Sequence, residues 1–216
     1  MMQLKALSKN QDLKPARLYL VRHGQVADGH THIYNGHNDV DLSPFGVRQF
    51  KALAQQWRHL PLGAVYASDR LRARRGAELI ARERGLPVQS VPEFRELNFG
   101  IWEGLSFAEI AQRYPQELQN RFQDLTNYRI PGGESLADVK ARVLPALERL
   151  RQRHEGEHFL IVAHAGINRI ILCEALGLTL DCLFRLDQTY AGYNIIDYFP
   201  ELAVVRLLNA TIPPLA

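Results

Sequence analysis

Short apolar runs alternate along the chain with segments that are apolar at every third or fourth position. Residues 18–21 and 64–67 are apolar runs of strand length, and a third short strand is predicted at 88–91. The unbroken apolar run at 159–163 predicts a strand that is buried on both faces. This alternation of strands with helical patterns is typical of an α/β fold.

Residues that favour helix ends delimit the helices between these strands. Ser43, followed by a proline, predicts the start of a helix whose apolar positions continue to residue 57. Residues 68–69 are the predicted cap of a second helix, which is expected to end near Gly85, a residue suited to a left-handed helix end. The pattern S-x-x-D at 135–138 predicts a capping box at the start of a third helix.

Two of the predicted strands end in a histidine followed closely by a glycine. The first strand continues into Arg22, His23 and Gly24, and the run at 159–163 turns at His164 into an apolar helix. Ligands of open α/β sheets bind beyond the carboxyl ends of the strands, and a helix N-terminus there attracts anions. From the residues alone, the two histidines either face each other across an anion pocket or end two unrelated strands.

Length and composition limit the possible classes of protein. One large domain is sufficient for 216 residues, and 46% hydrophobic with 23% charged residues is an ordinary globular composition. The formal net charge of +3 does not require a nucleic-acid or membrane partner. The first fifteen residues lack an apolar core of signal-peptide length, which predicts a cytoplasmic protein. Cys173 and Cys182 form no CxxC pair and are expected to be buried, reduced thiols.

Five motifs occur in one order along the chain: RHG at 22–24, SDRLRA at 68–73, ELNFGIWEG at 96–104, PGGES at 131–135 and VAHAG at 162–166. With these motifs the chain resembles the histidine phosphatase superfamily, the phosphoglycerate mutase-like group, from about residue 17 to residue 209. The resemblance implies a three-layer α/β/α fold, in which a mostly parallel central sheet has helices on both faces. It also implies one histidine phosphatase domain over 1–216, with an N-terminal extension at 1–16.

The resemblance further implies the catalytic residues. His23 would be the nucleophile that accepts the phosphoryl group, and Arg22, Arg72 and His164 would surround the phosphate oxygens. Guanidinium groups offer forked donors that match a phosphate, and a neutral imidazole attacks when an acceptor holds its other ring nitrogen. Glu96 would protonate the leaving oxygen and afterwards help a water molecule attack the phosphohistidine.

Several further residues are candidates by position. Asn35 falls where relatives place an asparagine that contacts phosphate, whereas Glu103 is expected to be structural. The segment 183–198 is similar to the branch that includes α-ribazole-5'-phosphate phosphatases, and Gln25 stands where the family often has glutamate or serine. The candidates for the substrate pocket are Gln25, Gln188, Tyr190 and Tyr193.

Two polar clusters allow other interpretations. His30, His32 and His37, with Asp28 and Asp39, resemble a metal-ligand set, because HxH pairs are common in metallohydrolases. Such hydrolases usually need a (β/α)₈ barrel of about 250 residues, so the segment is interpreted as a solvated loop that borders the substrate, without a metal.

The second cluster, RLRARR at 70–75, resembles a basic nucleic-acid patch. Helical winding distributes Arg70, Arg72, Arg74 and Arg75 over different faces, so only Arg72 is expected to enter the pocket, and no nucleic-acid partner is predicted.

The functional hypothesis is a phosphomonoesterase that needs neither cofactor nor metal and forms a phosphohistidine. Its substrate is expected to be a small phosphorylated metabolite, with α-ribazole-5'-phosphate as a candidate. The main alternative is a phosphoglycerate mutase, although mutases of this family are typically longer and contain an inserted segment that is absent from this sequence. A metallohydrolase and a noncatalytic phosphate-binding module are the alternatives from other classes.

Overall fold

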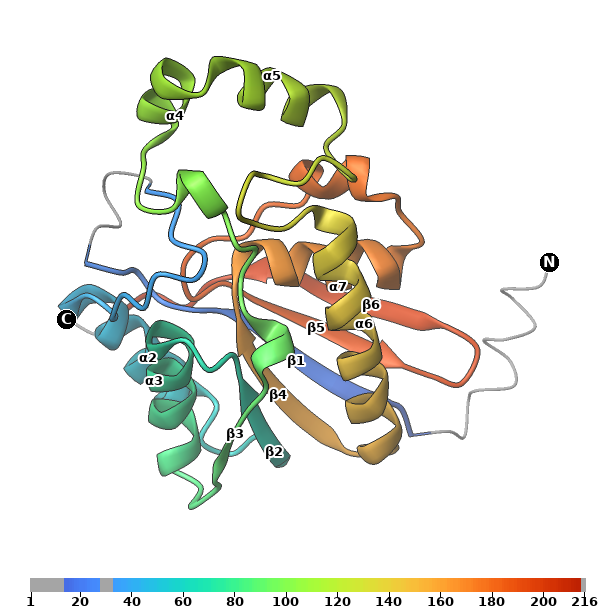
Figure 1. Cartoon of the computed structure of the whole chain (residues 1–216). Coiled ribbons are helices and arrows are strands. Elements are labelled where there is room, and N and C mark those ends of the chain that lie inside the picture. Colours follow the sequence, from blue (N-terminus) through green and yellow to red (C-terminus); the bar gives the residue numbers. More distant parts are fainter. Residues whose placement is uncertain (1–13, 28–32, 215–216) are drawn as a thin grey trace.

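A six-stranded sheet forms the centre of the molecule in this computed structural model, which describes residues 14–27 and 33–214 (Figure 1). The strand order is β3-β2-β4-β1-β5-β6. Strands β3, β2, β4 and β1 are mutually parallel, whereas β5 is antiparallel to β1 and β6 is antiparallel to β5. The strands are β1 (Ala16–Arg22), β2 (Leu62–Ala67), β3 (Val88–Ser90), β4 (His158–Ala163), β5 (Tyr193–Tyr198) and β6 (Ala203–Ala210).

Helices cover both faces of this sheet, which confirms the predicted three-layer α/β/α fold (Figure 1). Side chains alternate along β1, so Leu18 and Leu20 join the core beneath α6 and α7, while Tyr19 and Val21 join the core beneath α2 and α3. The α-helices are α2 (Pro44–Gln56), α3 (Leu71–Arg82), α4 (Phe107–Arg113), α5 (Pro115–Gln123), α6 (Leu136–Arg153) and α7 (Ala165–Leu176), and the 3₁₀ turns are η1 (Pro92–Phe94), η2 (Gly100–Trp102) and η3 (Leu180–Arg185).

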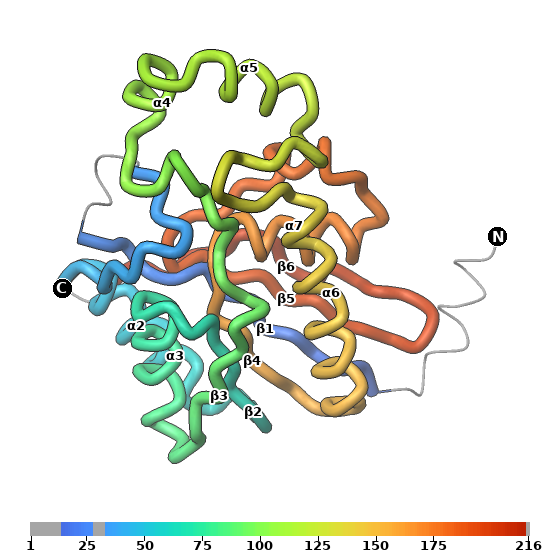
Figure 2. Tube along the Cα trace, viewed as in Figure 1, coloured from blue at the N-terminus to red at the C-terminus, as the bar shows by residue number. Residues whose placement is uncertain are grey.

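Helices α4 and α5 lie apart from the sheet, at the upper edge of the molecule as drawn in Figure 2. None of the helices in the described part of the chain is long and apolar enough to cross a membrane. The predicted extension at 1–16 lies outside the described residues up to position 13.

Two of the three predicted helix caps are confirmed. The Oγ of Ser43 accepts a hydrogen bond from the Gly46 N–H at 3.0 Å, at the start of α2. Ser135 and Asp138 form a reciprocal capping box at the start of α6. Each cap satisfies backbone N–H groups that the first turn of a helix leaves without a partner.

The predicted cap of α3 is wrong. The helix begins at Leu71, and the side chain of the preceding residue, Arg70, accepts no hydrogen bond from the first turn. Asp69 instead pairs with Arg95, and the N–H of Leu71 donates to Oδ1 of Asp39 at 2.7 Å. A carboxylate from a distant loop therefore takes the capping role, a contact that no local pattern in the sequence indicates.

Gly76 of α3 lies against the buried ring of Phe50 in α2. A Cβ atom at this glycine would come within 2.7 Å of the Phe50 ring. The closeness of the two helices therefore depends on the missing side chain.

We expect Gly76→Ala to lower the free energy of unfolding by about 1–3 kcal/mol, because overpacking must displace a ring that has no free space. Urea unfolding measures the change. Gly63→Ala in β2, where the nearest atom would lie 3.4 Å away, is the matched control and should have little effect. Equal stabilities for the two variants would contradict the packing argument.

Candidate active site

A cavity of about 440 Å³ opens beyond the carboxyl end of β1. His23 follows β1 and His164 follows β4, and these two strands pair in parallel. The two imidazole rings consequently lie next to each other, with 5.2 Å between their centroids. The two histidines thus end neighbouring strands and their rings meet edge to face, but His23 lines the cavity and the buried His164 does not. The polar residues that line the cavity are Arg22, His23, Asn35, Arg72, Glu96, Arg169 and Tyr190.

His23 is held in one tautomer by its own loop. Its Nδ1 lies 2.8 Å from the carbonyl oxygen of Gly24. Because a carbonyl only accepts, Nδ1 must carry the hydrogen, and the lone pair is on Nε2. Burial, reinforced by Arg72 and Arg22, lowers the pKa of His23 well below its ordinary value, so the ring stays neutral. The same causes, led by burial, lower the pKa of His164.

Two arginines border this pair of histidines: Arg72 is buried and makes three hydrogen bonds to the protein, whereas Arg22 is partly buried and makes one. Arg22 donates from Nη1 to the carbonyl of Gln188 at 2.6 Å and lies 4.0 Å from the centroid of the Tyr190 ring. Arg72 donates to the carbonyls of Asn35, Gly36 and Asn38 at 2.7–2.8 Å.

Four buried nitrogen atoms of this group have no hydrogen-bond partner among the described residues. They are Nε of Arg22, Nε of Arg72 and both ring nitrogens of His164. Buried polar atoms without partners are rare in folded proteins. Two guanidinium groups and two imidazoles with spare hydrogen-bonding capacity have the composition of an anion site.

Glu96 lies against the N-terminus of α7. Its Oε1 accepts from the N–H of Leu97 at 2.9 Å, and its Oε2 accepts from the N–H of Gly166 at 3.0 Å. A Cβ atom at Gly166 would overlap Oε1 of Glu96, so glycine is needed for this close approach. Arg142 of α6 supports the same segment by donating to the backbone carbonyls of Arg95 and Glu96 at 2.8 and 3.1 Å.

The loop at 35–38 is held between two opposite charges. Arg72 donates hydrogen bonds to carbonyl groups of the loop. On the other side, the carboxylate of Glu103 accepts from the N–H groups of Gly36, His37 and Asn38 at 3.1, 2.9 and 3.3 Å. Glu103 also accepts from the N–H of Phe99 at 3.0 Å. The carboxylate thus has the structural role expected of it, and the loop it holds carries Asn35 into the cavity lining.

Two predicted pocket residues lie behind the cavity instead of in its lining. The side chain of Gln188 is buried and donates to Oδ1 of Asn194 at 3.1 Å, while its backbone carbonyl holds Arg22. Oε1 of Gln25 accepts from the hydroxyl of Ser43, the cap of α2, at 3.0 Å. The Gln188 amide and Oε1 of Gln25 are thus bonded to protein groups, and neither residue lines the cavity.

Tyr193 also lies outside the lining. Its ring packs on Trp57, with 4.9 Å between centroids, because Tyr193 joins the core beneath α2 and α3. Tyr190, named with it as a candidate, does line the cavity and stacks with Arg22.

Sequence reasoning missed Arg169 and the apolar part of the lining. Arg169 follows Gly166 by three positions on α7, a spacing that places both residues on one side of the helix. This spacing could have predicted that Arg169 lies near the site. The apolar lining comes from separate loops that no periodic pattern connects: Val26, Ile33, Tyr34, Phe99 and Phe107.

Of the predicted loop cluster, His30, His32 and Asp28 lie outside the described residues, while His37 and Asp39 lie within them. His37 accepts from Arg70 through its carbonyl, and Asp39 caps α3. Residues 14–27 and 33–214 contain no group of three or more histidine, cysteine or acidic side chains able to hold a metal ion. The arginines of 70–75 diverge as expected, since Arg72 alone of them lines the cavity.

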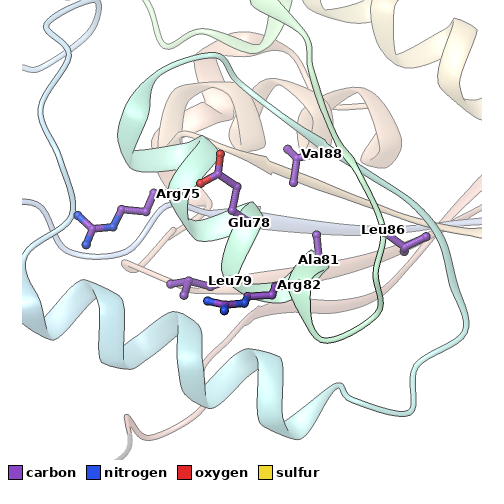
Figure 3. Close-up of a pocket in the computed structure, with 7 residues that line it drawn as sticks. All are labelled: Arg75, Glu78, Leu79, Ala81, Arg82, Leu86 and Val88. Atoms are coloured by element: carbon purple, nitrogen blue, oxygen red, sulfur yellow. The ribbon is translucent and has the colours of Figure 1, made fainter.

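A second hollow lies beside α3, remote from these residues (Figure 3). Its charged groups belong to exposed turns of the helix, and one of them, Arg75, pairs with Asp41. Its lining contains no nucleophile or imidazole and consists of Arg75, Glu78, Leu79, Ala81, Arg82, Leu86 and Val88. The cavity beyond β1 is the candidate active site, because its lining holds a histidine and two guanidinium groups whose Nε atoms have no partner among the described residues.

Comparison with known proteins agrees with this geometry. The family model for the histidine phosphatase superfamily (branch 1) matches residues 18–211. A bifunctional protein of Mycobacterium tuberculosis is 37% identical over 199 residues, which are 91% of this chain and 54% of that protein, so the chain spans about half the length of this relative. Phosphoserine phosphatase 1 of Hydrogenobacter thermophilus is 31% identical over 90% of this chain and 92% of that protein. The crystal structure of the alpha-ribazole phosphatase from Shigella flexneri matches with a TM-score of 0.82 at 27% identity, over 90% of this chain and 96% of that one.

We expect Glu103→Gln to loosen the loop at 35–38, because an amide replaces one acceptor oxygen by a donor that faces backbone N–H groups. Leaving such groups unsatisfied costs about 1–3 kcal/mol. Hydrogen exchange of the amides of residues 36–38 should accelerate, and urea unfolding should show the loss of stability. Glu83→Gln, at an exposed helix end, is the control. Unchanged exchange in Glu103→Gln would show that the carboxylate does not hold the loop.

The low pKa values of His23 and His164 make stability depend on pH. The unfolded chain binds protons on these histidines below about pH 6.5 and the folded chain does not, so stability falls as pH falls through this window. Each histidine contributes up to about 1.4 kcal/mol per pH unit. His164→Gln should therefore reduce the slope of unfolding free energy between about pH 6.5 and 5 in phosphate-free buffer. His59→Gln, at an exposed position, is the control, and equal slopes in both variants would refute the prediction.

Proposed function

We propose that this chain, which belongs to the histidine phosphatase superfamily, hydrolyses phosphomonoesters through a phosphohistidine formed at His23. The observation that carries the proposal is the hydrogen bond between Nδ1 of His23 and the Gly24 carbonyl at 2.8 Å. It leaves the lone pair of Nε2 available beside a cluster of unsatisfied cationic donors, which is the arrangement that a nucleophile for phosphorus requires.

The first step transfers the phosphoryl group to the enzyme. Nε2 of His23 attacks phosphorus, the bond from phosphorus to the ester oxygen breaks, and Glu96 gives its proton to that oxygen as the alcohol leaves. Arg22, Arg72 and His164 stabilise the charge on the three equatorial oxygens. The Gly24 carbonyl continues to accept from Nδ1–H and so stabilises the positive charge that the imidazole gains.

The second step restores the enzyme. A water molecule attacks phosphorus from the side that the alcohol has left, and the carboxylate of Glu96 takes its proton. The bond from phosphorus to Nε2 breaks, and its electron pair returns to the ring of His23. Inorganic phosphate is the product, and Glu96 is again protonated for the next cycle.

The substrate that we propose is a small phosphorylated metabolite. The similarity to phosphatases named for phosphoserine and alpha-ribazole supports hydrolysis, and the mutase alternative has less support. The apolar lining, which includes Tyr34, Phe99 and Phe107, offers contact area to the alcohol part of the ester. A cytoplasmic location and a single domain over 1–216 remain predictions from the sequence.

Substitution of His23 and Glu96 tests the two steps through the leaving group. His23→Ala removes the attacking atom, so turnover of every ester should be lost. Glu96→Gln cannot donate a proton, so phosphohistidine formation should slow by about 10²–10⁴-fold with alkyl esters. With a nitrophenyl ester, whose alcohol leaves without protonation, the loss should be much smaller, and a burst of nitrophenol should precede slow dephosphorylation.

Rapid mixing with quantification of acid-labile phosphoenzyme measures these rates. Glu117→Gln on α5, outside the cavity, is the matched control. Equal losses for alkyl and nitrophenyl esters would show that Glu96 is not the proton donor. All reactions are run with and without EDTA, because the proposal assigns every chemical role to a side chain. Loss of activity with EDTA and recovery with Zn²⁺ would contradict it.

A further inference from the structure

Within the described part of the chain, Arg169 is the one guanidinium in the cavity lining that the proposed mechanism does not use. We propose that it forms a second anion subsite, and that the preferred substrates are phosphomonoesters of alcohols that carry a carboxylate close to the ester oxygen. This inference rests on the proposed phosphatase function and specifies the substrate class of the same site.

Arg169 is held in place while its outer donors remain available. Its Nε donates to the backbone carbonyl of Leu186 at 2.7 Å, and its guanidinium lies 5.6 Å from the centroid of the Phe184 ring. Its two terminal nitrogens make no hydrogen bond or ion pair with any residue in 14–27 or 33–214. A guanidinium fixed at Nε presents a planar pair of donors, which matches a carboxylate in a bidentate arrangement.

The position of Arg169 places this subsite on the leaving-group side. It follows by one helical turn the segment of α7 whose N–H group holds Glu96. Glu96 and Arg169 line the same cavity, and burial lowers the pKa of Arg169 against the smaller raising effect of the Glu96 charge. Since Glu96 is the proposed proton donor to the leaving oxygen, a group bound by Arg169 belongs to the alcohol and not to the phosphate.

The charge balance of the cavity leads to the same conclusion. Among residues 14–27 and 33–214, the charged groups that line it are Arg22, Arg72, Arg169 and one carboxylate, that of Glu96, which must be protonated when it acts as the general acid. A phosphate dianion then balances two of the three guanidinium groups. Arg169 is partly buried, so its charge is partly removed from water, and this burial lowers its pKa. A substrate carboxylate would supply the partner that this charge lacks.

Matched pairs of esters test the subsite. O-phosphoserine and O-phosphoethanolamine differ only by a carboxylate, and 3-phosphoglycerate and glycerol 3-phosphate differ by a carboxylate in place of a hydroxymethyl group. The wild-type chain should prefer the carboxylated member of each pair by about tenfold or more in kcat/KM, mainly through KM, as expected for one charged hydrogen-bonded pair. α-Ribazole-5'-phosphate, a nucleotide-like ester without a carboxylate, should behave as the uncharged members do.

Arg169→Gln should reduce the preference within each pair to nearly one, and Arg169→Lys should retain part of it, because lysine keeps the charge but not the planar fork. Arg185→Gln, at an exposed position of η3, removes a nearby positive charge from outside the lining and should leave the ratio unchanged. A loss in Arg169→Gln that depends on the carboxylate, at an unchanged thermal midpoint, separates direct binding from loss of structure.

The outcomes also separate this inference from the proposed function. No preference in the wild-type chain, or equal loss for both members of a pair in Arg169→Gln, would overturn the subsite while nitrophenyl phosphate turnover still supports a phosphatase. Absence of turnover of every ester, together with absence of phosphohistidine, would overturn the proposed function and the subsite with it.

Discussion

The parallel pairing of β1 with β4 places the two histidines of the candidate site next to each other. Arg22 is opposite Ala163 in this register, so the next residues along the two strands, His23 and His164, emerge together at one edge of the sheet. Both strands are buried on both faces, and a slip of one residue would exchange the side chains of the two cores. The hydrophobic sequence of the strands therefore specifies the distance between the two histidine rings. Strand β2, which pairs with β4 on its other side, leads into α3 and so brings Arg72 to the same edge.

Gathering cationic groups at this edge is costly in the absence of an anion, and the surrounding structure compensates with backbone dipoles. The carbonyls of residues 35, 36 and 38 accept from Arg72, and that of Gln188 accepts from Arg22. The loop that supplies three of these carbonyls would itself carry unsatisfied N–H groups, which Glu103 accepts from the opposite side. The guanidinium, loop and carboxylate thus form one polar layer in which each charge is satisfied by peptide groups, while Nε of Arg72 stays without a protein partner.

The sequence predicted those parts of the fold that depend on local pattern. The apolar runs of β1, β2 and β4 and the caps Ser43 and Ser135 carry their own physical signals. Helices α4 and α5 were not predicted from the sequence. They lie away from the sheet, and α4 buries only one of its residues, Ile110, so its apolar pattern is weak. The sequence correctly predicted that Gln25 and Gln188 lie near the site, but their side chains bond to other protein groups and do not line the cavity. The position of a residue in the sequence indicates which segment is near the site, and not the direction of its side chain.

The residues proposed to contact phosphate and the other residues of the cavity lining differ in what determines their positions. The residues proposed to contact phosphate end a strand, follow one directly or lie in the first turn of α3, so their positions depend on the sheet and on short motifs beside it. The rest of the lining comes from separate segments: Ile33 and Tyr34 after β1, Phe99 before η2, Phe107 at the start of α4, and Arg169 on α7. Loops and peripheral helices tolerate substitution far better than paired strands do. The proposed reaction can consequently be predicted from the sequence motifs. The specificity for the alcohol part of the substrate depends instead on residues that meet only after folding, and Arg169 is the charged residue among them.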